Sequence, residues 1–421
     1  MASLLPSDIH RYSDAELSEL YPADLKLLLV QSIFRHGERA PVRVRLENAG
    51  IPRHFDLCNH VSLFQAAVKL VNDAGNTTWG RLPYTRLIEE TDDTGKARLA
   101  SPGSAKGTCL LGELTDKGRA STVHLGERLR ELYVTRLGFA REINVSKELY
   151  LRSSPMPRAL ESLQQVYSGL FPVDTLNRLT EPIHIRQRNF TEENLFPNEG
   201  MCPKLRQLSV EYAKKAADEW NPILAGHVTD VLGRYVDAPV RVDGHPRLSG
   251  LMDTINATRG NDLELPAELL DAEMLDTMHK AVVSEWFGGY LADNTYRRLG
   301  AGRILGDFKD QIVAVTKGSP LKFALYGAHD TTLGAILASV GGFDHEWPRF
   351  TSHIALETFE RKSSSFLGLF EARQHLVRMR YNDRIINIPS CRNPQMCTLK
   401  EFVDLVDKLT PDDWQEECKI N

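Results

Sequence analysis

Three short apolar runs stand out along the chain, and each one ends at polar residues. They are residues 25–34 (LKLLLVQSIF), 148–152 (ELYLR) and 321–326 (LKFALY). Near-continuous apolar runs of this length are typical of strands that are buried on both faces of a parallel sheet. The pattern therefore predicts three strands of a mostly parallel sheet.

A helix is predicted between the first two runs. Leu125, Leu129, Leu132 and Tyr133 recur at helical spacing, with Arg and Glu on the other face. Thr115 is the expected N-cap, although a glycine in the first turn weakens this assignment. The order strand, helix, strand predicts an α/β fold in which a mostly parallel central sheet is flanked by helices.

Two insertions are expected to interrupt this α/β core. We assign residues 20–45, 108–190 and 300–421 to the core, and residues 46–107 and 191–299 to helical cap insertions. The first insertion is rich in turn residues and the second in helix formers. In the second insertion, four large aromatic side chains are expected to lie in the hydrophobic core and not to line the substrate pocket. They are Trp220, Trp286, Phe287 and Tyr290. Extra strands are expected over 353–388, with a hairpin turn near Asn382 and Asp383.

Composition narrows the class of protein. The chain has 421 residues and a formal net charge of -5, which disfavours a nucleic-acid-binding face but allows a local arginine pocket. We expect no transmembrane span, since there is no apolar stretch of about 18 residues. The N-terminus has no signal-peptide pattern and carries several acidic residues, so a cytoplasmic location is expected. The sequence gives no indication of oligomeric state.

The six cysteines do not indicate a metal site. No two have the C-x-x-C spacing of a zinc or redox centre, and no metal or other cofactor is expected. Cys391 and Cys397 are close enough in sequence to close a small loop in an oxidising compartment. In the cytoplasm we expect free thiols.

The strongest chemical signal is the run Arg35-His36-Gly37-Glu38-Arg39-Ala40-Pro41, directly after the first predicted strand. In open α/β sheets, ligands bind beyond the carboxyl ends of the strands. Two guanidinium groups beside a histidine there suit a dianionic phosphoryl group, because their paired N–H donors match phosphate oxygens.

The other two predicted strands end in the same kind of residue. Arg152 closes the second strand, and His329 and Asp330 follow the third. Three strands thus end in residues suited to phosphate binding or proton transfer. This convergence predicts one site for phosphate binding and proton transfer, and its candidate residues are Arg35, His36, Arg39, Arg152, His329 and Asp330.

At this point the sequence resembles a known family. RHGERAP is similar to the R-H-G-x-R-x-P motif of the histidine acid phosphatases, a branch of the histidine phosphatase superfamily. GELTDKG at 112–118, LRSSPMPRALES at 151–162, YGAHDTTL at 326–333 and SCRNPQMCTLKEFV at 390–403 resemble later elements of that family, in order. Within it the chain looks most similar to the lysophosphatidic acid and prostatic acid phosphatase types.

The resemblance implies a metal-independent phosphomonoesterase of the histidine phosphatase (phosphoglycerate mutase-like) fold. His36 would be the nucleophile that becomes a phosphohistidine, and Asp330 would protonate the leaving group. The implied substrate is a small-molecule or lysophospholipid-type monoester. Arg158 is expected to support its helix or the surroundings of the site, and Glu38 to form a structural ion pair in preference to a substrate contact. Three further histidines are taken as structural: His124, His184 and His353.

Three alternatives remain open. A phytase-like enzyme would need a broad basic pocket, and neither insertion has an obvious lysine-arginine cluster. A non-catalytic phosphate-binding protein would be expected to lack the nucleophile or the acid, yet both are present. A mutase would return the phosphoryl group to its substrate, and the His-Asp pair favours hydrolysis by analogy with the family.

Overall fold

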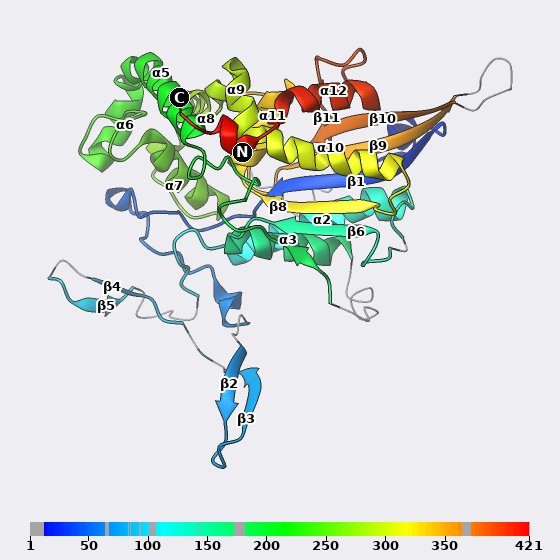
Figure 1. The fold of residues 1–421 in the computed structure, drawn as a ribbon. Coiled ribbons are helices and arrows are strands. Elements are labelled where there is room, and N and C mark those ends of the chain that lie inside the picture. The colour runs from blue at the N-terminus through cyan, green and yellow to red at the C-terminus, as the bar shows by residue number, and fades with distance from the viewer. Residues whose placement is uncertain are drawn as a thin grey trace.

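The structure is a computed structural model that describes residues 12–63, 67–82, 84, 86–91, 94–100, 107–141, 143–171, 182–363 and 372–420. A twisted central sheet has helices on both faces, and a group of helices lies at one end of it (Figure 1).

The central sheet has a parallel half and an antiparallel half. The parallel half contains, in spatial order, β1 (Leu25–Arg35), β8 (Phe323–Ala328), β6 (Leu149–Ser153) and β7 (Ile185–Arg186). On the other side of β1 lie the antiparallel strands β9 (His353–Ser363), β10 (Ala372–Tyr381) and β11 (Arg384–Ile385), and β12 (Cys397–Thr398) also pairs with β10. The three predicted strands are therefore confirmed as neighbours, and so is the α/β fold class.

The side chains of β1 alternate between two hydrophobic cores. Leu29 and Ile33 pack with the helices α10 (Arg303–Thr316), α11 (Asp330–Val340) and α12 (Leu399–Leu409). Val30 and Phe34 pack with α2 (Asp116–Leu129) and α3 (Pro157–Leu170) on the opposite face (Figure 1). Because successive side chains of a strand point to opposite faces, one apolar run serves both cores.

The predicted helix after residue 115 is confirmed as α2. The Thr115 side chain caps it by accepting a hydrogen bond from the Gly118 backbone N–H. Close packing explains the glycine at position 118, because a Cβ atom there would lie 2.0 Å from the Glu38 carbonyl oxygen. The helix continues as a π-helical segment over Arg130–Arg136, labelled η4.

Residues 191–299 form most of the helical group at the end of the sheet. Its elements are α5 (Pro203–Leu224), α6 (His227–Val236), α7 (Leu248–Gly260), η5 (Ala267–Leu270), α8 (Ala272–Ala292) and α9 (Asn294–Arg297), followed by η6 (Arg298–Gly302). Phe287 and Tyr290 are buried and Trp220 is partly buried, as predicted. Trp286 is 38% exposed and stacks edge-on against Trp347, so the prediction of a core position is wrong for that residue.

The helical character predicted for residues 46–107 is wrong for the residues described there. They form two short 3-10 turns, η2 (Glu47–Ala49) and η3 (Asn59–Leu63), and two β-hairpins. The hairpins pair β2 (Ala67–Val71) with β3 (Thr77–Arg81) and β4 (Glu89–Thr91) with β5 (Ala97–Leu99), and they project from the body in Figure 1. Threonine, valine and tryptophan favour strands, and the intervening turn residues close the β2–β3 hairpin.

The C-terminal part contains the predicted extra strands. Asn382 and Asp383 both have positive φ, 46° and 69°, and they join β10 to β11 in the predicted hairpin. Asparagine and aspartate tolerate this left-handed backbone, which a tight two-residue turn requires.

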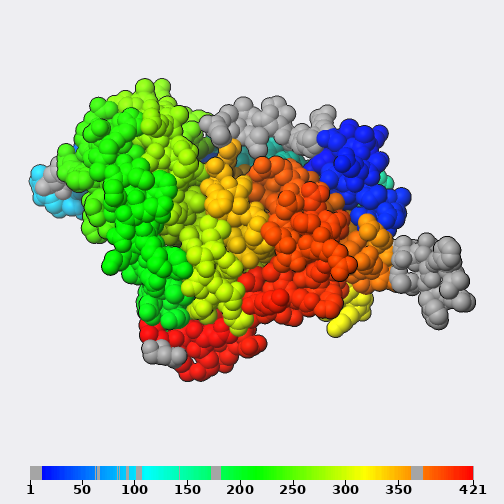
Figure 2. Space-filling model, turned by 90° about the horizontal axis from the view of Figure 1, so that it is seen from above, coloured from blue at the N-terminus to red at the C-terminus, as the bar shows by residue number. Residues whose placement is uncertain are grey.

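The three disulfides are Cys58–Cys109, Cys202–Cys418 and Cys391–Cys397. The second ties α5 to the segment after α13 (Trp414–Glu417), and Figure 2 shows the C-terminal residues against the helical group. At the other end of the described chain, Ser13 and Glu16 form a capping box for α1 (Asp14–Leu20). None of the described helices is both long and apolar enough to cross a membrane.

Candidate active site

His36 lies at the carboxyl end of β1 and is 2% exposed. Its backbone N–H donates to the Ala328 carbonyl at the end of β8, 3.1 Å away, and its own carbonyl accepts from the Thr351 N–H at 3.4 Å. The ends of two parallel strands therefore hold His36 in place. This position is where an open α/β sheet is expected to bind its ligand.

The imidazole of His36 has one nitrogen engaged. Nδ1 lies 2.9 Å from the Gly37 carbonyl oxygen. A carbonyl can only accept, so Nδ1 must carry the hydrogen, and the lone pair of the neutral ring is on Nε2. Burial lowers the pKa of His36 well below its ordinary value, and the charges of Arg158, Arg39 and Arg35 lower it further. His36 is therefore neutral, with Nε2 as a potential nucleophile.

His329, the last residue before α11, lies beside His36. The two ring centroids are 5.5 Å apart, and Nε2 of His329 is 2.9 Å from the Ser154 hydroxyl oxygen. Burial, followed by the charge of Arg158, lowers the pKa of His329 to about 3. A neutral His329 can donate one hydrogen bond without adding a further full charge to the site.

Two arginines of the sequence motif approach the same place. Arg35 bonds the Pro348 carbonyl at 2.7 Å, and its guanidinium carbon lies 4.0 Å from the centroid of the Phe350 ring. Arg39 pairs with Asp253 on α7, at 2.6 Å between Nη2 and Oδ1. The helical group thus contributes to the site, since α7 fixes the orientation of Arg39.

Arg158 is the third arginine near His36, whereas the sequence predicted that it supports its helix or the surroundings of the site. It sits in the first turn of α3, and its hydrogen-bond acceptor is the Met156 sulfur at 3.2 Å. Among the described residues no carboxylate lies within ion-pair distance of it. Burial lowers the pKa of Arg158 to about 10, and Arg39 and Arg35 add to this effect. We call Arg35, Arg39 and Arg158 the arginine cup.

Asp330 faces the cup from the first turn of α11. Its Oδ2 atom lies 2.8 Å from Nη2 of Arg35 and accepts a hydrogen bond from the Trp347 indole at 3.2 Å, while Oδ1 accepts from the Thr331 N–H at 2.8 Å. Burial acts to raise the pKa of Asp330, but Arg35, Arg39 and His329 outweigh it, so the pKa is lowered.

Arg152 does not belong to this cluster, which corrects the sequence prediction. Its guanidinium is held by Glu193 at 2.6 Å, Asn194 at 2.6 Å and Asp307 at 2.8 Å, and the residue is 1% exposed. The last residues of β6 point alternately to the two faces of the sheet, and Arg152 points to the face that carries Asp307 on α10. Arg158, six residues later, lies near His36 in place of Arg152.

The other residues considered in the sequence are placed as follows. Glu38 makes no ion pair among the described residues; it accepts a hydrogen bond from the Ser121 hydroxyl, and burial raises its pKa. His124 pairs with Glu127 at 2.7 Å, His184 is exposed, and His353 lies 3.6 Å from Asp383 in a buried position. None of these contacts of Glu38, His124 and His353 involves His36.

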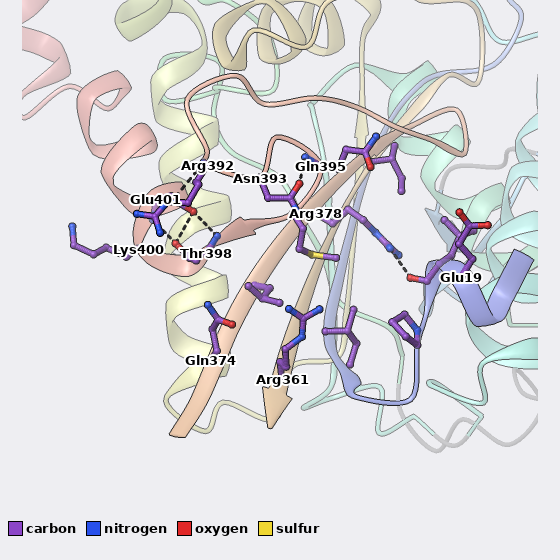
Figure 3. Close-up of a pocket in the computed structure, with 16 residues that line it drawn as sticks. Glu19, Arg361, Gln374, Arg378, Arg392, Asn393, Gln395, Thr398, Lys400 and Glu401 are labelled. Carbon is purple, nitrogen blue, oxygen red and sulfur yellow. Dashed lines mark hydrogen bonds between the residues drawn. The ribbon is translucent and has the colours of Figure 1, made fainter. Parts of the chain in front are cut away.

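A separate groove of about 650 Å³ lies on the antiparallel half of the sheet (Figure 3). Several cations line it, but carboxylates match them: Arg361 pairs with Asp24, Arg378 with Glu357 and Lys400 with Asp404. Glu401 caps α12 together with Thr398. The groove therefore has no clear cationic excess and contains none of the predicted site residues.

The described residues contain no group of three or more His, Cys, Asp or Glu side chains arranged to hold a metal ion. The cationic character of the site comes instead from the arginine cup.

Comparison with known proteins points to one family. The sequence profile described as "Histidine phosphatase superfamily (branch 2)" matches residues 26–382. A probable acid phosphatase of Schizosaccharomyces pombe is 41% identical, with 95% of each chain covered. The human lysophosphatidic acid phosphatase type 6 is 25% identical over 96% of this chain and 90% of its own.

Solved structures agree on the fold. The apo form of Hafnia alvei phytase superimposes with a TM-score of 0.60 at 14% identity, covering 95% of this chain and all of the phytase chain. A Bifidobacterium longum multiple inositol polyphosphate phosphatase, in complex with inositol hexasulfate, also has a TM-score of 0.60, at 12% identity, covering 98% of this chain and 97% of its own. At these identities the similarity concerns the fold alone.

Proposed function

Because the chain belongs to branch 2 of the histidine phosphatase superfamily, we propose that it hydrolyses phosphate monoesters through a phosphohistidine formed on His36. The family resemblance found in the sequence is thereby confirmed. The observation that carries the proposal is a neutral, buried imidazole with a free Nε2 at the centre of three arginines.

The first step follows from this geometry. Nε2 of His36 attacks phosphorus, a P–N bond forms, and the bond from phosphorus to the ester oxygen breaks. Arg35, Arg39 and Arg158 bind the equatorial oxygens of the phosphoryl group and stabilise its charge in the transition state. Paired N–H donors suit this task because two of them can bind two phosphate oxygens at once.

Asp330 supplies the proton that the leaving alkoxide needs. In the free protein, Arg35 and its neighbours favour the carboxylate form. A bound phosphoryl dianion offsets these positive charges and so raises the pKa of Asp330, which favours the protonated form at acidic pH. In the second step the Asp330 carboxylate takes a proton from water. That water attacks phosphorus, the P–N bond breaks, and inorganic phosphate leaves.

We propose a small-molecule or lysophospholipid-type monoester, which the relatives named as acid and lysophosphatidic acid phosphatases support. A phytase-like activity remains the alternative, and a comparison of turnover on phytate and on simple monoesters separates the two.

The experiment that tests the reaction uses p-nitrophenyl phosphate in the presence of EDTA. We expect turnover without added metal and a loss of about 10³-fold or more in His36→Ala, because removing a nucleophile leaves only binding and electrostatic effects. His184→Ala, which changes an exposed histidine, is the matched control. Retention of activity by His36→Ala would refute the proposal.

Trapping identifies the intermediate. Rapid acid-free quenching after mixing with labelled substrate should leave phosphate on His36 in the wild-type protein, in an alkali-stable form. Label recovered on another residue would exclude His36 as the nucleophile while leaving phosphatase activity itself intact.

A further inference from the structure

A row of aromatic rings leads from the site to the surface. The Phe196 ring centroid lies 6.0 Å from that of His329, and the Phe190 ring lies 5.5 Å beyond Phe196. Phe196 is partly buried and Phe190 is 52% exposed. We call Phe190 and Phe196 the aromatic wall. His329 is part of the proposed phosphate site and directly precedes Asp330, the proposed proton donor, so the wall adjoins that site.

The segment that carries the wall is fixed to the sheet by buried polar contacts. The Glu193 carboxylate accepts hydrogen bonds from its neighbours' backbone N–H groups, Asn194 and Leu195, and pairs with Arg152. The Leu195 carbonyl accepts from the Thr332 hydroxyl on α11. These contacts hold the segment in one conformation. Its phenylalanines therefore lose little conformational entropy when a ligand binds, which is the property of a preformed binding surface.

Arg152 has a function in this arrangement that differs from the predicted one. It joins Glu193 and Asn194 to Asp307 on α10, and Asp307 also pairs with Arg188 at 2.7 Å. The arginine therefore acts as a positioning residue for the segment between the two phenylalanines. Its neighbour Arg188 pairs with the same carboxylate.

Apolar groups also border the cup near Arg158. The sulfur of Met156 contacts Arg158, and a Cβ placed on Gly112 would lie 3.5 Å from both Arg158 and a methyl group of Val42. Val42 is 39% exposed. Beyond its cationic centre, the site is thus bordered by apolar side chains at Met156 and Val42 as well as at the wall.

We propose that the aromatic wall is a leaving-group subsite, which selects monoesters whose alcohol carries an aromatic ring or an acyl chain. This inference rests on the proposed function, because it places the phosphoryl group in the arginine cup. Stacking or packing of an apolar group on Phe196 and Phe190 removes apolar surface from water and so favours such esters over polar ones.

Two pairs of substrates test the subsite. 2-Naphthyl phosphate is compared with glycerol 3-phosphate, and 1-hexanoylglycerol 3-phosphate with glycerol 3-phosphate, which contains the same ester bond without the acyl chain. In Phe196→Ala and Phe190→Ala/Phe196→Ala we expect the kcat/KM ratio of apolar to polar ester to fall about 10-fold. Trp79→Ala is the matched control, since Trp79 is an aromatic side chain 72% exposed on the β2–β3 hairpin, and it should leave the ratio unchanged.

The outcomes separate the subsite from the reaction. If wild-type protein hydrolyses none of these esters, the proposed function fails. If it hydrolyses them and the ratio is unchanged in the wall variants, or both esters lose activity equally, the subsite is overturned and the reaction stands. A fall confined to naphthyl phosphate assigns the wall to aromatic alcohols, and a fall confined to the acylated ester assigns it to acyl chains.

The positioning role of Arg152 has its own readout. Asp307→Asn, which weakens the contact to Arg152 at a partly exposed residue, should raise KM for the apolar esters more than it lowers kcat. Arg152→Lys should keep more of the substrate preference than Arg152→Met. A loss of kcat on every ester with unchanged preference would instead assign Arg152 a general structural role.

Discussion

Two regions of the molecule gather buried arginines, and they differ in how those charges are matched. In the arginine cup, Arg35 and Arg39 each have one carboxylate partner and Arg158 has none among the described residues. On the antiparallel half of the sheet, Arg378 and Arg380 both face Glu357, at 2.7 and 3.6 Å. We call the latter group, together with Tyr12, Tyr21 and Tyr133, the sheet cluster.

The pKa of a buried arginine is shifted in opposite directions in the two regions. In the cup, burial and neighbouring arginines lower the pKa of Arg158 to about 10. In the sheet cluster, burial acts in the same direction, but Glu357 outweighs it and the pKa of Arg380 is raised. A guanidinium group costs free energy when it is buried near like charges, and an arriving anion can recover that free energy. An arginine without a carboxylate partner, such as Arg158, is therefore a candidate contact for an anion, whereas Arg378 and Arg380, which both face Glu357, form a structural contact.

The largest expected effect tests this contrast within the cup. Arg158→Ala should lower kcat/KM for p-nitrophenyl phosphate by about 10³-fold, since removing one group that stabilises transition-state charge typically costs 10²- to 10³-fold or more. Thermal stability should be unchanged or higher, because the change relieves repulsion from Arg39 and Arg35. The measurements are steady-state kinetics and a thermal melt.

Arg206→Ala is the matched control, because Arg206 lies on α5 outside the arginine cup. It should leave kcat/KM near the wild-type value. If Arg158→Ala loses stability but keeps full activity per folded molecule, the assignment of Arg158 to the phosphate site is wrong.

The next effect concerns stability in the sheet cluster. Glu357→Gln removes the charge that faces two buried arginines and should lower the free energy of unfolding by about 3–5 kcal/mol. Its other contacts include the Tyr133 hydroxyl at 2.8 Å, which the amide can still satisfy. Urea unfolding measures the change, and kcat/KM of the folded fraction should stay close to wild type.

An exposed ion pair provides the reference for this measurement. Glu211→Gln breaks a pair with Lys215 in which both side chains are more than half exposed, so it should change the free energy of unfolding by less than about 1 kcal/mol. Equal effects of Glu357→Gln and Glu211→Gln would mean that the buried ion pairs of Glu357 contribute no more to stability than an exposed ion pair does.

The pH dependence of stability gives a third test. Burial lowers the pKa of His353 to about 4, although Asp383 opposes the shift. A histidine whose folded pKa is depressed binds more protons in the unfolded chain, so stability is lost as the pH falls from about 6.5 toward 4. Between pH 7 and pH 4, the free energy of unfolding should therefore decrease by about 3 kcal/mol less in His353→Gln than in the wild-type protein.

Urea unfolding at pH 7 and pH 4 measures this difference, with His184→Gln as the exposed control. Identical losses in wild type and His353→Gln would show that other groups, among them the histidines of the site, account for the acid sensitivity.

The sequence predicted the parts of the fold and site that depend on local pattern. The three apolar runs identified β1, β6 and β8, and the motif beginning at Arg35 placed His36 at a strand end. Arg152 was misassigned because strand-end position alone does not say to which face a side chain points. Arg158 lies six residues further on, and the signal that could have found it is its position in the first turn of α3, a helix directed at the site.

The helical assignment of 46–107 failed for a related reason. Hairpins such as β2–β3 contribute little apolar periodicity, because most of their side chains are exposed.

The pairing of the cysteines could not be predicted from their spacing, since partners such as Cys202 and Cys418 are 216 residues apart in the sequence. The three disulfides favour an oxidising compartment, which we now propose in place of the cytoplasmic location expected from the N-terminus.

The smallest predicted effect compares the two buried carboxylates. Glu357 is surrounded by two arginines and two tyrosine hydroxyls, whereas Asp330 has Arg35 and the Trp347 indole. The backbone of Trp347 is held in turn by His279 of α8, at 2.9 Å. We infer that Trp347 positions the carboxyl group of Asp330 for proton transfer to the leaving group.

Trp347→Phe keeps most of the ring packing and removes the indole N–H. Loss of one hydrogen bond to a charged group should lower kcat about 5-fold for glycerol 3-phosphate, whose alkoxide needs a proton. The effect should be about 2-fold or less for p-nitrophenyl phosphate, because p-nitrophenolate leaves readily without protonation. Equal losses on both esters would mean that Trp347 maintains the shape of the site and has no specific effect on Asp330. The larger loss on the alkyl ester should also appear in Asp330→Asn, which removes the proton donor itself.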